Sequence, residues 1–532
     1  MCVQNVCVPS GTHRRSGKEY HMFSSVYSGG LLGIDGYQIQ VEADVSDGLP
    51  AFYMVGYLSS EVKEAEQRVR SAMKNSGFRL EAKKITVNLS PAHIKKEGTA
   101  FDLPIAVAVL ASYGMLPVSE LKESAFFGEL GLDGGCKPIR GVLPLVLAMR
   151  EAGLCRCFLP AENVAEGLAV EGVQIIKVSH LKQLVEMLTG IAYIRGEMRE
   201  FIPEQTGNTG YTVDFSEVNG QQLLRRATEI AVAGQHNILY IGPPGSGKSM
   251  IARRIPTIMP SLSKEEQLEI SKIYSICGMI PSDSSLLNTR PFRAPHHTIS
   301  PQALAGGGKV PKPGEISLAS RGVLFLDELT EFQKGTLEIL RQPLEEHRIT
   351  VARLHGSCVF PAHFMLAAAM NPCPCGFYPD EHLCNCSEWQ IRRYLGKVSR
   401  PLLDRIDVCV EAEPVTYQEL QFNGRNESSE QIRVRVEAAH EIQKRRYKGK
   451  NVYFNAEMSG SHIREFCRLL PEDDLFLQQV FRRMNLSARG CHRVLRVART
   501  IADLEGQEQI QRSHLSEAVS YRNLEGKYWG GK

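Results

Sequence analysis

The stretch GPPGSGKS at 242–249 combines glycines, a lysine and a serine at the spacing of a loop that binds phosphate. Its glycines allow backbone N–H groups to surround phosphate oxygens. We expect Lys248 to reach the β and γ phosphates of ATP and Ser249 to offer its hydroxyl to Mg²⁺. The alternative is a glycine-rich turn, which the strand-like run before the loop and the helix-like run after it disfavour. The predicted nucleotide-binding residues are Gly242, Pro243, Pro244, Gly245, Ser246, Gly247, Lys248 and Ser249.

Two acidic residues end the apolar segment GVLFLDE at 322–328. Asp327 is expected to hold Mg²⁺ through water, and Glu328 to orient and activate the water that attacks the γ-phosphate. A further apolar run at 364–371 ends at Asn371, whose amide is suited to sense the γ-phosphate. These side chains predict hydrolysis of the nucleotide. The alternative for the two acids is a strand that ends in a surface loop.

Two arginines complete the predicted catalytic set. Arg405, in SRPLLDRID, is suited to reach the γ-phosphate bound by a neighbouring subunit, as an arginine finger does. Its alternative is a surface salt bridge with Asp404 or Asp407. Arg489 opens a helix-like segment near the C-terminus and could close over the same nucleotide, although other arginines lie close to it in the sequence.

These residues need strands and helices that bring distant segments together. Strand-like and helix-like runs alternate from 216 to about 415 and predict an α/β core, whereas 431–525 reads as helical throughout. The segment from 26 to about 188 also alternates and predicts a second α/β domain. Its expected strands include 37–46, 83–90 and 155–160, and its expected helices include 59–77, 103–112 and 142–152.

Polar stretches suggest the domain boundaries of a multidomain α/β protein. We expect a disordered extension at 1–21, with Met22 as a possible start of the protein, and a linker at 196–215. The remaining predicted domains are an N-terminal α/β domain at 22–195, an ATPase core at 216–422 and a C-terminal helical lid at 423–532.

The composition of the 532 residues is that of an ordinary globular protein, with 43% hydrophobic and 23% charged residues. A formal net charge of +3 neither demands nor excludes a nucleic-acid partner. The most apolar run, 103–118, is too short to span a bilayer, and the N-terminus lacks the apolar segment of a signal peptide. We expect a cytoplasmic protein without a membrane segment.

Several motifs together resemble the magnesium-chelatase-like AAA+ proteins of the YifB/ComM type. They are RPFRAPHHTIS, ALAGGGKVPKPGEISLASRGVLFLDELTEF, LRQPLEE, MNPCPCG and LLDRIDV. The resemblance extends from about Tyr27 to Tyr521. It implies a ring, a hexamer, with ATP between subunits and Arg405 acting in trans. For ComM-type members it implies a DNA motor that moves branch points during recombination in natural transformation, on single-stranded or branched DNA.

The N-terminal domain resembles the fold of Lon proteases but departs from their Ser–Lys dyad. Ala100, Phe101 and Asp102 occupy the neighbourhood of the nucleophile, and Leu143 stands about where the lysine belongs. A dyad of Thr99 with Lys95 or Lys96 is the remaining alternative. Without a nucleophile and its activating base, covalent proteolysis is not expected.

Four cysteines are clustered in CPCGFYPDEHLCNC at 373–386. Four thiolates in two C-x-C pairs suit a closed, tetrahedral zinc site, with His382 as a spare ligand. Reduced thiols and an iron–sulfur centre are the alternatives, and a disulfide is not expected in a reducing compartment. The predicted ligands are Cys373, Cys375, Cys384 and Cys386.

Two basic segments could contact DNA phosphates. The glycine-rich insertion at 305–315 carries Lys309 and Lys312, and a predicted hairpin at 347–361 carries Arg348 and Arg353. Both segments contain few aromatic residues, so contact by charge is expected more than base stacking. The alternative for each is a solvated loop.

Four functions share such a core. A DNA motor is favoured by the resemblance and by the basic insertions. A magnesium-chelatase motor subunit would lack the Lon-like domain and the four cysteines, and a protease would need the missing dyad. An ATPase that remodels proteins is the alternative that the sequence excludes least.

Overall fold

In this computed structural model the described residues are 23–192, 196–197, 211–281, 285–308, 311–353, 356–380, 382–414, 417 and 426–529. The chain divides into two compact units, Met1–Ile202 with Ile280–Ser285 and Pro203–Met279 with Leu286–Lys532. The predicted extension at 1–21 and most of the predicted linker lie outside the described residues. The structure is mixed α/β, as the sequence predicts.

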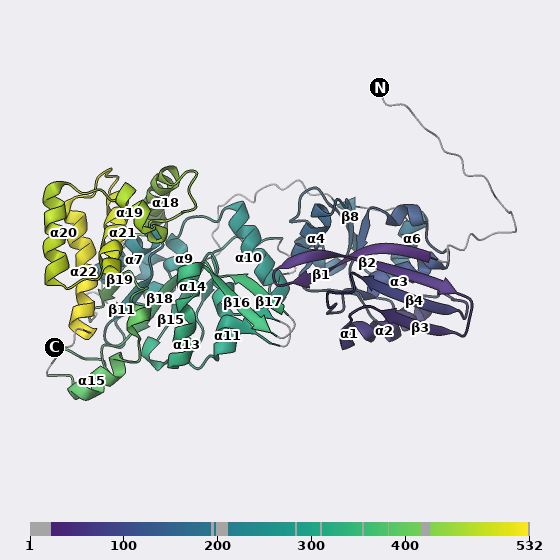
Figure 1. Cartoon of the computed structure of the whole chain (residues 1–532), viewed down its shortest axis with the longest axis horizontal. Coiled ribbons are helices and arrows are strands. Elements are labelled where there is room, and N and C mark those ends of the chain that lie inside the picture. The colour runs from purple at the N-terminus through teal and green to yellow at the C-terminus, as the bar shows by residue number, and fades with distance from the viewer. Residues whose placement is uncertain are drawn as a thin grey trace, which may run out of the picture. The chain divides into compact units, whose positions relative to one another are not determined.

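The first unit is built on an eight-stranded mixed sheet of order β10-β9-β8-β5-β1-β2-β4-β3 (Figure 1). The predicted strands are confirmed, and along β2 and β4 buried residues alternate with more exposed ones, which places one face of each of these strands in the core. The strands are β1 (Phe23–Leu32), β2 (Asp35–Ser46), β3 (Ala51–Val55), β4 (Lys84–Ser90), β5 (Ser124–Phe126), β8 (Arg156–Pro160), β9 (Gln174–Val178) and β10 (Gly196–Glu197). A separate ribbon pairs β6 (Glu129–Leu130) with β7 (Cys136–Lys137).

Helices of the first unit follow the predicted segments with one difference. The segment 59–77 forms two helices, because Gln67 N bonds the carbonyl three residues back at Glu64 and tightens the chain there. The helices are α1 (Ser60–Lys63), α2 (Ala65–Asn75), α3 (Asp102–Ser112), α4 (Val142–Glu151), α5 (Val164–Gly167) and α6 (Leu181–Leu188). All residues of α3 are buried, so its apolar sequence fills the core. Among the described residues, none of the helices is both long and apolar enough to cross a membrane.

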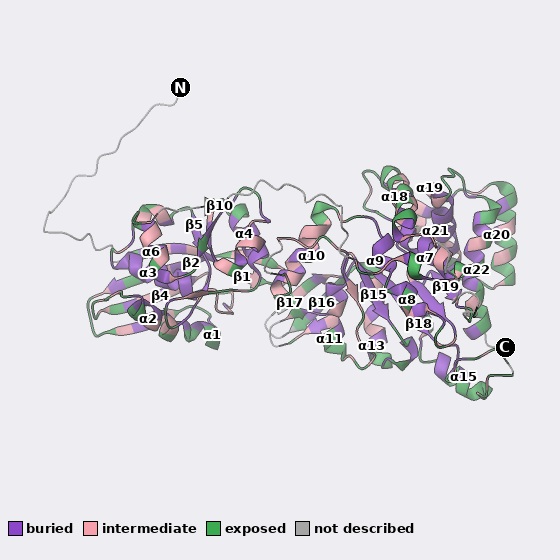
Figure 2. Cartoon of the chain, turned by 180° about the vertical axis from the view of Figure 1, so that it is seen from behind, coloured by how far each residue is buried: buried purple, intermediate pink, exposed green. Residues whose placement is uncertain are grey.

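The second unit holds a parallel five-stranded sheet of order β12-β15-β18-β11-β19. The three central strands are apolar along their whole length, as expected of parallel strands covered on both faces (Figure 2). The strands are β11 (Ile238–Ile241), β12 (Phe292–Arg293), β15 (Val323–Leu326), β18 (Met365–Met370) and β19 (Val408–Glu411).

Short helices connect the strands of this sheet, and two ribbons project from it. The ribbons are β13 (Gly306–Gly307) with β14 (Lys312–Pro313), and β16 (Arg348–Arg353) with β17 (Gly356–Pro361), which confirms the predicted hairpin. The connecting helices are α7 (Gln222–Gly234), α8 (Lys248–Ala252), α9 (Ile255–Ile258), α10 (Lys264–Cys277), α11 (Pro301–Ala305), α12 (Glu315–Leu318), α13 (Lys334–Glu338), α14 (Pro343–Glu346), α15 (Glu388–Leu395) and α16 (Arg400–Leu403).

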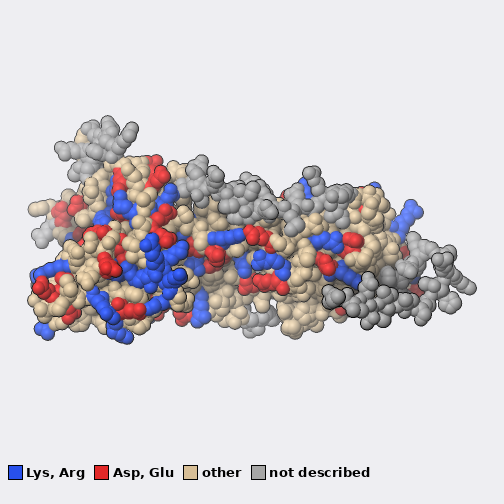
Figure 3. Space-filling view, turned by 90° about the horizontal axis from the view of Figure 1, so that it is seen from above, with Lys and Arg blue, Asp and Glu red and all other residues tan. Residues whose placement is uncertain are grey.

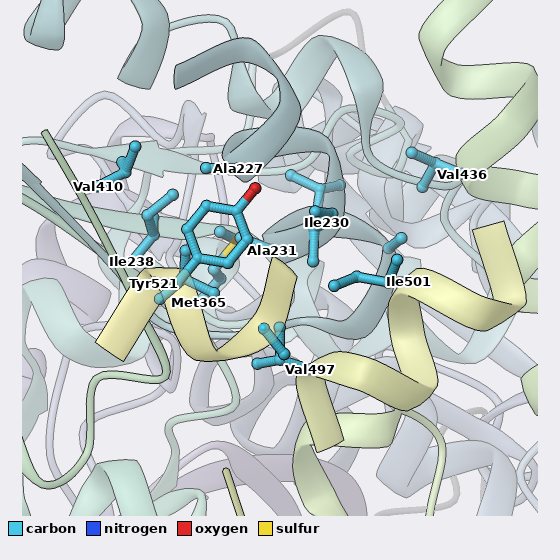
Figure 4. Packing of buried hydrophobic residues seen from close by; sticks show 14 of the residues in the cluster. Ala227, Ile230, Ala231, Ile238, Met365, Val410, Val436, Val497, Ile501 and Tyr521 are labelled. Carbon is cyan, nitrogen blue, oxygen red and sulfur yellow. The ribbon is translucent and has the colours of Figure 1, made fainter. Parts of the chain in front are cut away.

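The C-terminal helices belong to the same unit as this sheet. They share one core with it, in which Val497, Ile501 and Tyr521 meet Ile238 and Met365 of the strands (Figure 4). These C-terminal helices are α18 (Ser429–Arg446), α19 (Gly460–Phe466), α20 (Pro471–Arg483), α21 (Ala488–Leu504) and α22 (Arg512–Trp529). The shared core holds the middle of α21, where Val497 and Ile501 are buried, whereas Arg489 near the start of this helix is exposed.

Candidate active site

The phosphate loop, residues 242–249, leaves the carboxyl end of β11 and leads into α8. Gly245 and Gly247 have φ angles of 78° and 82°, a left-handed conformation that glycine adopts without strain. Lys248 is buried and folds back over the loop, where its Nζ donates to the carbonyls of Gly242 and Pro243 at 2.7 Å each. Bound phosphates would offer this amine stronger acceptors at the same place.

The side chains predicted to act on Mg²⁺ and water meet at the same edge of the sheet. Ser249 Oγ donates to Asp327 Oδ2 at 2.7 Å, so the hydroxyl and the carboxylate can share one ion. Asn371 follows β18, and its Oδ1 lies 3.4 Å from Lys248 Nζ. Because β11, β15 and β18 are parallel neighbours, their carboxyl ends bring these groups together.

The position of Glu328 is set by a left-handed backbone conformation and by a contact with a histidine. Its φ of 51° and ψ of 50° are left-handed, and its N–H donates to Asp327 Oδ1 at 3.0 Å. His297 Nδ1 lies 3.3 Å from Glu328 Oε2, while the neighbouring His296 Nδ1 contacts Thr298 Oγ1. The sequence alone does not decide whether His296 and His297 are pocket residues or packing residues. The available signal was their position just after β12, at the catalytic edge of the sheet.

Arg405 and Arg489 lie at the opposite edge. Asn237, which precedes β11, donates from Nδ2 to the carbonyl of Arg405 at 2.8 Å. The five steps from Asn237 to Gly242 span roughly 17 Å at about 3.3 Å per residue. Arg405 and Arg489 therefore line a pocket that is separate from the phosphate loop of their own chain.

This arginine pocket has a volume of about 280 Å³. Arg405 donates to Glu345 at 2.6 Å and to the carbonyls of Arg341 and Pro401. It therefore forms an ion pair, but with Glu345 and not with Asp404 or Asp407, the partners considered from the sequence. Arg489 is exposed at the start of α21. Other histidine and arginine side chains that line the pocket are His347, His363, His492, Arg493 and Arg496.

One wall of the pocket contains a group that could be mistaken for a metal site. Ligand atoms of His347, His363 and Glu457 lie within 4.8 Å of one another. Arg321 Nη1 lies 2.6 Å from His363 Nδ1, and arginine can only donate, so the His363 proton is on Nε2. That N–H donates to Glu457 at 2.6 Å. The group therefore links the sheet to the C-terminal helices and has no free imidazole nitrogen on His363 for a metal.

The four-cysteine loop, residues 373–386, begins two residues after Asn371. Cys373 Sγ lies 3.3 Å from Cys375 Sγ and 3.8 Å from Cys384 Sγ, and the last two sulfurs are 3.6 Å apart. Cys386 completes a group whose sulfurs all lie within 4.8 Å. Four sulfurs at about 2.3 Å from a tetrahedral zinc would be about 3.8 Å apart. The spacing of the thiols therefore fits this ion.

The segments compared with the Lon dyad form no nucleophilic pair. Asp102 is buried and accepts two hydrogen bonds from Arg68, at 2.7 Å and 2.9 Å, and Leu143 is buried in the core. Lys96 Nζ donates to the backbone carbonyls of Pro91 and Ile94. Lys95 pairs with Glu97 at 2.5 Å. Both lysines are thus engaged by groups other than Thr99.

The candidate DNA contacts are only partly described. Lys312 is exposed on β14, and Arg348 is exposed on β16, where it pairs with Glu346 at 3.2 Å. Lys309 lies outside the described residues, as does the side chain of Arg353. The structure therefore places one basic side chain on each projecting ribbon.

We expect Lys248 to make nucleotide binding depend on pH. Burial lowers the pKa of Lys248 to about 8, and the charge of Asp327 opposes this shift. Bound phosphates favour the ammonium form, so the complex has the higher pKa. Affinity for ATP is therefore expected to be highest below about pH 8 and to fall by up to about tenfold per pH unit above it. Titration with a fluorescent ATP analogue between about pH 7 and about pH 9.5 measures this. Constant affinity across that range contradicts the assignment.

Comparisons with known proteins agree with this geometry. The family described as magnesium chelatase, subunit ChlI, matches residues 214–420, its C-terminal family matches 426–522, and the family of subunit ChlI of Mg-chelatase matches 41–163. The chain is 41% identical over 504 residues to competence protein ComM of Haemophilus influenzae, covering 94% of this chain and 97% of that protein. It is 41% identical over 505 residues to YifB of Escherichia coli, covering 94% and 97%. It is 30% identical over 158 residues to the Lon protease of Koribacter versatilis, covering 28% and 19%.

Proposed function

Because this chain belongs to the magnesium-chelatase-like family that includes ComM and YifB, we propose that it is a ring-forming ATPase that moves DNA. Family membership implies ATP and Mg²⁺ as its ligands. The observation that supports hydrolysis is the meeting of Lys248, Ser249 and Asp327 at one edge of the parallel sheet. Glu328 then activates the attacking water, and Asn371 senses the γ-phosphate.

Assembly into a ring, a hexamer as the family resemblance implies, is supported by where the arginines lie. Arg405 and Arg489 line a pocket at the edge opposite their own phosphate loop. A neighbouring copy that presents its nucleotide to this pocket would supply both arginines with a phosphate partner. Arg489, which the sequence predicts to close over the same nucleotide as Arg405, lines the same pocket, and this supports action of both arginines across the subunit interface.

DNA is the proposed substrate, as single strands or branched duplexes. The name of the Haemophilus relative connects that protein to competence, and the two ribbons of this chain present Lys312 and Arg348. Lys and Arg side chains also gather over the C-terminal helices, at the left of Figure 3. Phosphate contacts of this kind bind DNA without reading its sequence and weaken with salt. The exposed basic residues on these helices and in the segments that follow them include Arg445, Lys448, Arg464, Arg468, Arg482 and Arg483.

The ATPase rate measured with and without DNA tests this proposal. At moderate salt, single-stranded and branched DNA should each raise the turnover number, and added salt should remove the effect. Healthy basal turnover without any response to DNA would contradict the DNA motor. It would favour the remodelling of a protein partner or a chelatase-like role.

Zinc is the proposed occupant of the four cysteines, which a reducing cytoplasm would keep as free thiols. Metal analysis of the purified chain should find about one zinc per chain. Cys384→Ser combined with Cys386→Ser should lose it, while Cys155→Ser, an exposed cysteine of the first unit, should keep it. Less than about half an equivalent of zinc in the unaltered protein would contradict the site.

The first unit is proposed to be a Lon-like domain that has lost proteolysis and serves in binding or ring formation. The engagement of Lys95 and Lys96 by other groups supports the absence of a dyad. Purified protein should leave an unfolded protein substrate intact in the presence of ATP, and cleavage that Thr99→Ala abolishes would contradict this.

A further inference from the structure

The four-cysteine loop is joined directly to the residue that faces Lys248. Cys373 is fully buried and stands two residues after Asn371. The N–H groups of Gly376 and Tyr378 donate to Cys373 Sγ at 3.2 Å and 3.4 Å. This backbone turn around one sulfur fixes where the chain goes after β18.

The same turn packs against the phosphate loop. Gly376 has a φ of 88°, and a Cβ built on it would lie 2.6 Å from Cδ and 3.1 Å from Cγ of Pro244. Such a distance means that the backbone at 376 touches the ring of Pro244. Only glycine allows this approach, both by its conformation and by its size. The loop therefore supports the phosphate loop from outside the nucleotide site.

The far side of the loop is held by α22. Tyr378 and Tyr528 make an edge contact with ring centroids 6.0 Å apart, and Tyr528 donates to Glu411 at 2.6 Å. Trp529 Nε1 donates to the carbonyl of Leu395 at the end of α15, at 3.1 Å. The loop thus lies between the phosphate loop and the last helix of the chain.

The four cysteines are the main feature that can hold this loop in shape. Residues 373–380 and 382–386, the described part of the loop, contain turns but no helix or strand. Order in such a segment has an entropic cost that a metal ion offsets by closing the loop. Without the ion, the contact of Gly376 with Pro244 loses its support.

We propose that the metal at the four cysteines sets the shape of the phosphate loop, so that affinity for ATP depends on metal occupancy. The inference rests on the proposed ATP site and adds its regulation. By linkage, the nucleotide must tighten metal binding by the same factor by which the metal tightens nucleotide binding. A cell that limits zinc would thereby lower the share of this ATPase that is loaded with ATP.

The test measures binding of a fluorescent ATP analogue to the full chain before and after removal of zinc by a chelator, and again after zinc is returned. Removal should weaken binding by about tenfold or more, and zinc should restore it. A chromophoric chelator should also compete less well for the zinc when ATP is present. The Cys155→Ser variant is the matched control and should behave as the unaltered protein.

The Gly376→Ala variant separates the contact from the ion. It keeps all four ligands, so it should retain about one zinc yet bind the analogue about tenfold more weakly. If the zinc-free protein unfolds, the affinity of Gly376→Ala for the analogue is the measurement that tests the coupling. Unchanged affinity in Gly376→Ala, or in folded zinc-free protein, overturns the coupling, as does a chain that binds no zinc. Failure of the zinc-loaded protein to bind the analogue at all would instead contradict the proposed ATP site.

Discussion

The Glu328→Gln variant is expected to bind ATP and to hydrolyse it at most about one hundredth as fast as the unaltered protein. The amide keeps the shape of the side chain but cannot take a proton from the attacking water, a step that contributes about 100-fold to 10,000-fold in such sites. Glutamine also loses the charge that faces His297, 3.3 Å from Glu328 Oε2. Steady-state turnover and analogue binding, measured on the same preparation, give the two quantities.

Glu331 offers a matched control substitution close to Glu328. Glu331 lies on the same short helical turn, pairs with Lys397 at 3.5 Å, and is exposed. Glu331→Gln should therefore keep normal turnover. Turnover in Glu328→Gln above about a tenth of the normal rate would remove Glu328 from the role of base.

The Arg405→Ala variant should lose ATP turnover by about 1,000-fold and regain it in mixed rings. An arginine supplied across an interface contributes about 1,000-fold to 100,000-fold to hydrolysis. When Arg405→Ala is mixed with Glu328→Gln, some interfaces combine an intact phosphate loop from the first variant with an intact arginine from the second. Turnover of the mixture above that of either variant alone is the expected result, and its absence would contradict action in trans.

Three controls distinguish this role from a structural one. Arg405 also holds Glu345 and two carbonyls, so thermal unfolding of the variant must be compared with that of the unaltered protein. Arg405→Lys keeps the charge but loses the planar fork and should remain impaired. Arg392→Ala, which removes only a pair with Glu388 one turn away on α15, should keep normal turnover.

Local sequence predicts the catalytic edge well. Apolar runs of four to six residues predict β11, β15 and β18, and each ends at a residue of the site. Parallel strands place these ends at one edge of the sheet, so Lys248, Asp327 and Asn371 could be expected at the same edge, and the adjacent positions of the three strands bring them together. Membership of the family was also predicted correctly from the motifs and is confirmed by the comparisons.

Features that depend on packing between distant segments could not be predicted. The position of Arg489 beside Arg405 requires the docking of α21, where Arg493 bonds Asp404 at 2.9 Å across 89 residues of sequence. The pairing of His297 with Glu328 depends on β12 lying next to β15. The contact of Gly376 with Pro244 needs the exact path of a loop without helix or strand among its described residues. No periodicity in the sequence encodes such contacts.

ATP hydrolysis by this chain is proposed to move DNA. The most direct measurement follows a labelled strand released from a branched DNA junction, with the unaltered protein and with Glu328→Gln. Release that requires ATP and Mg²⁺, and that Glu328→Gln cannot support although it binds ATP and DNA, is the predicted result. A protein that hydrolyses ATP at its normal rate and binds the junction, yet never releases or exchanges a strand, would contradict the account.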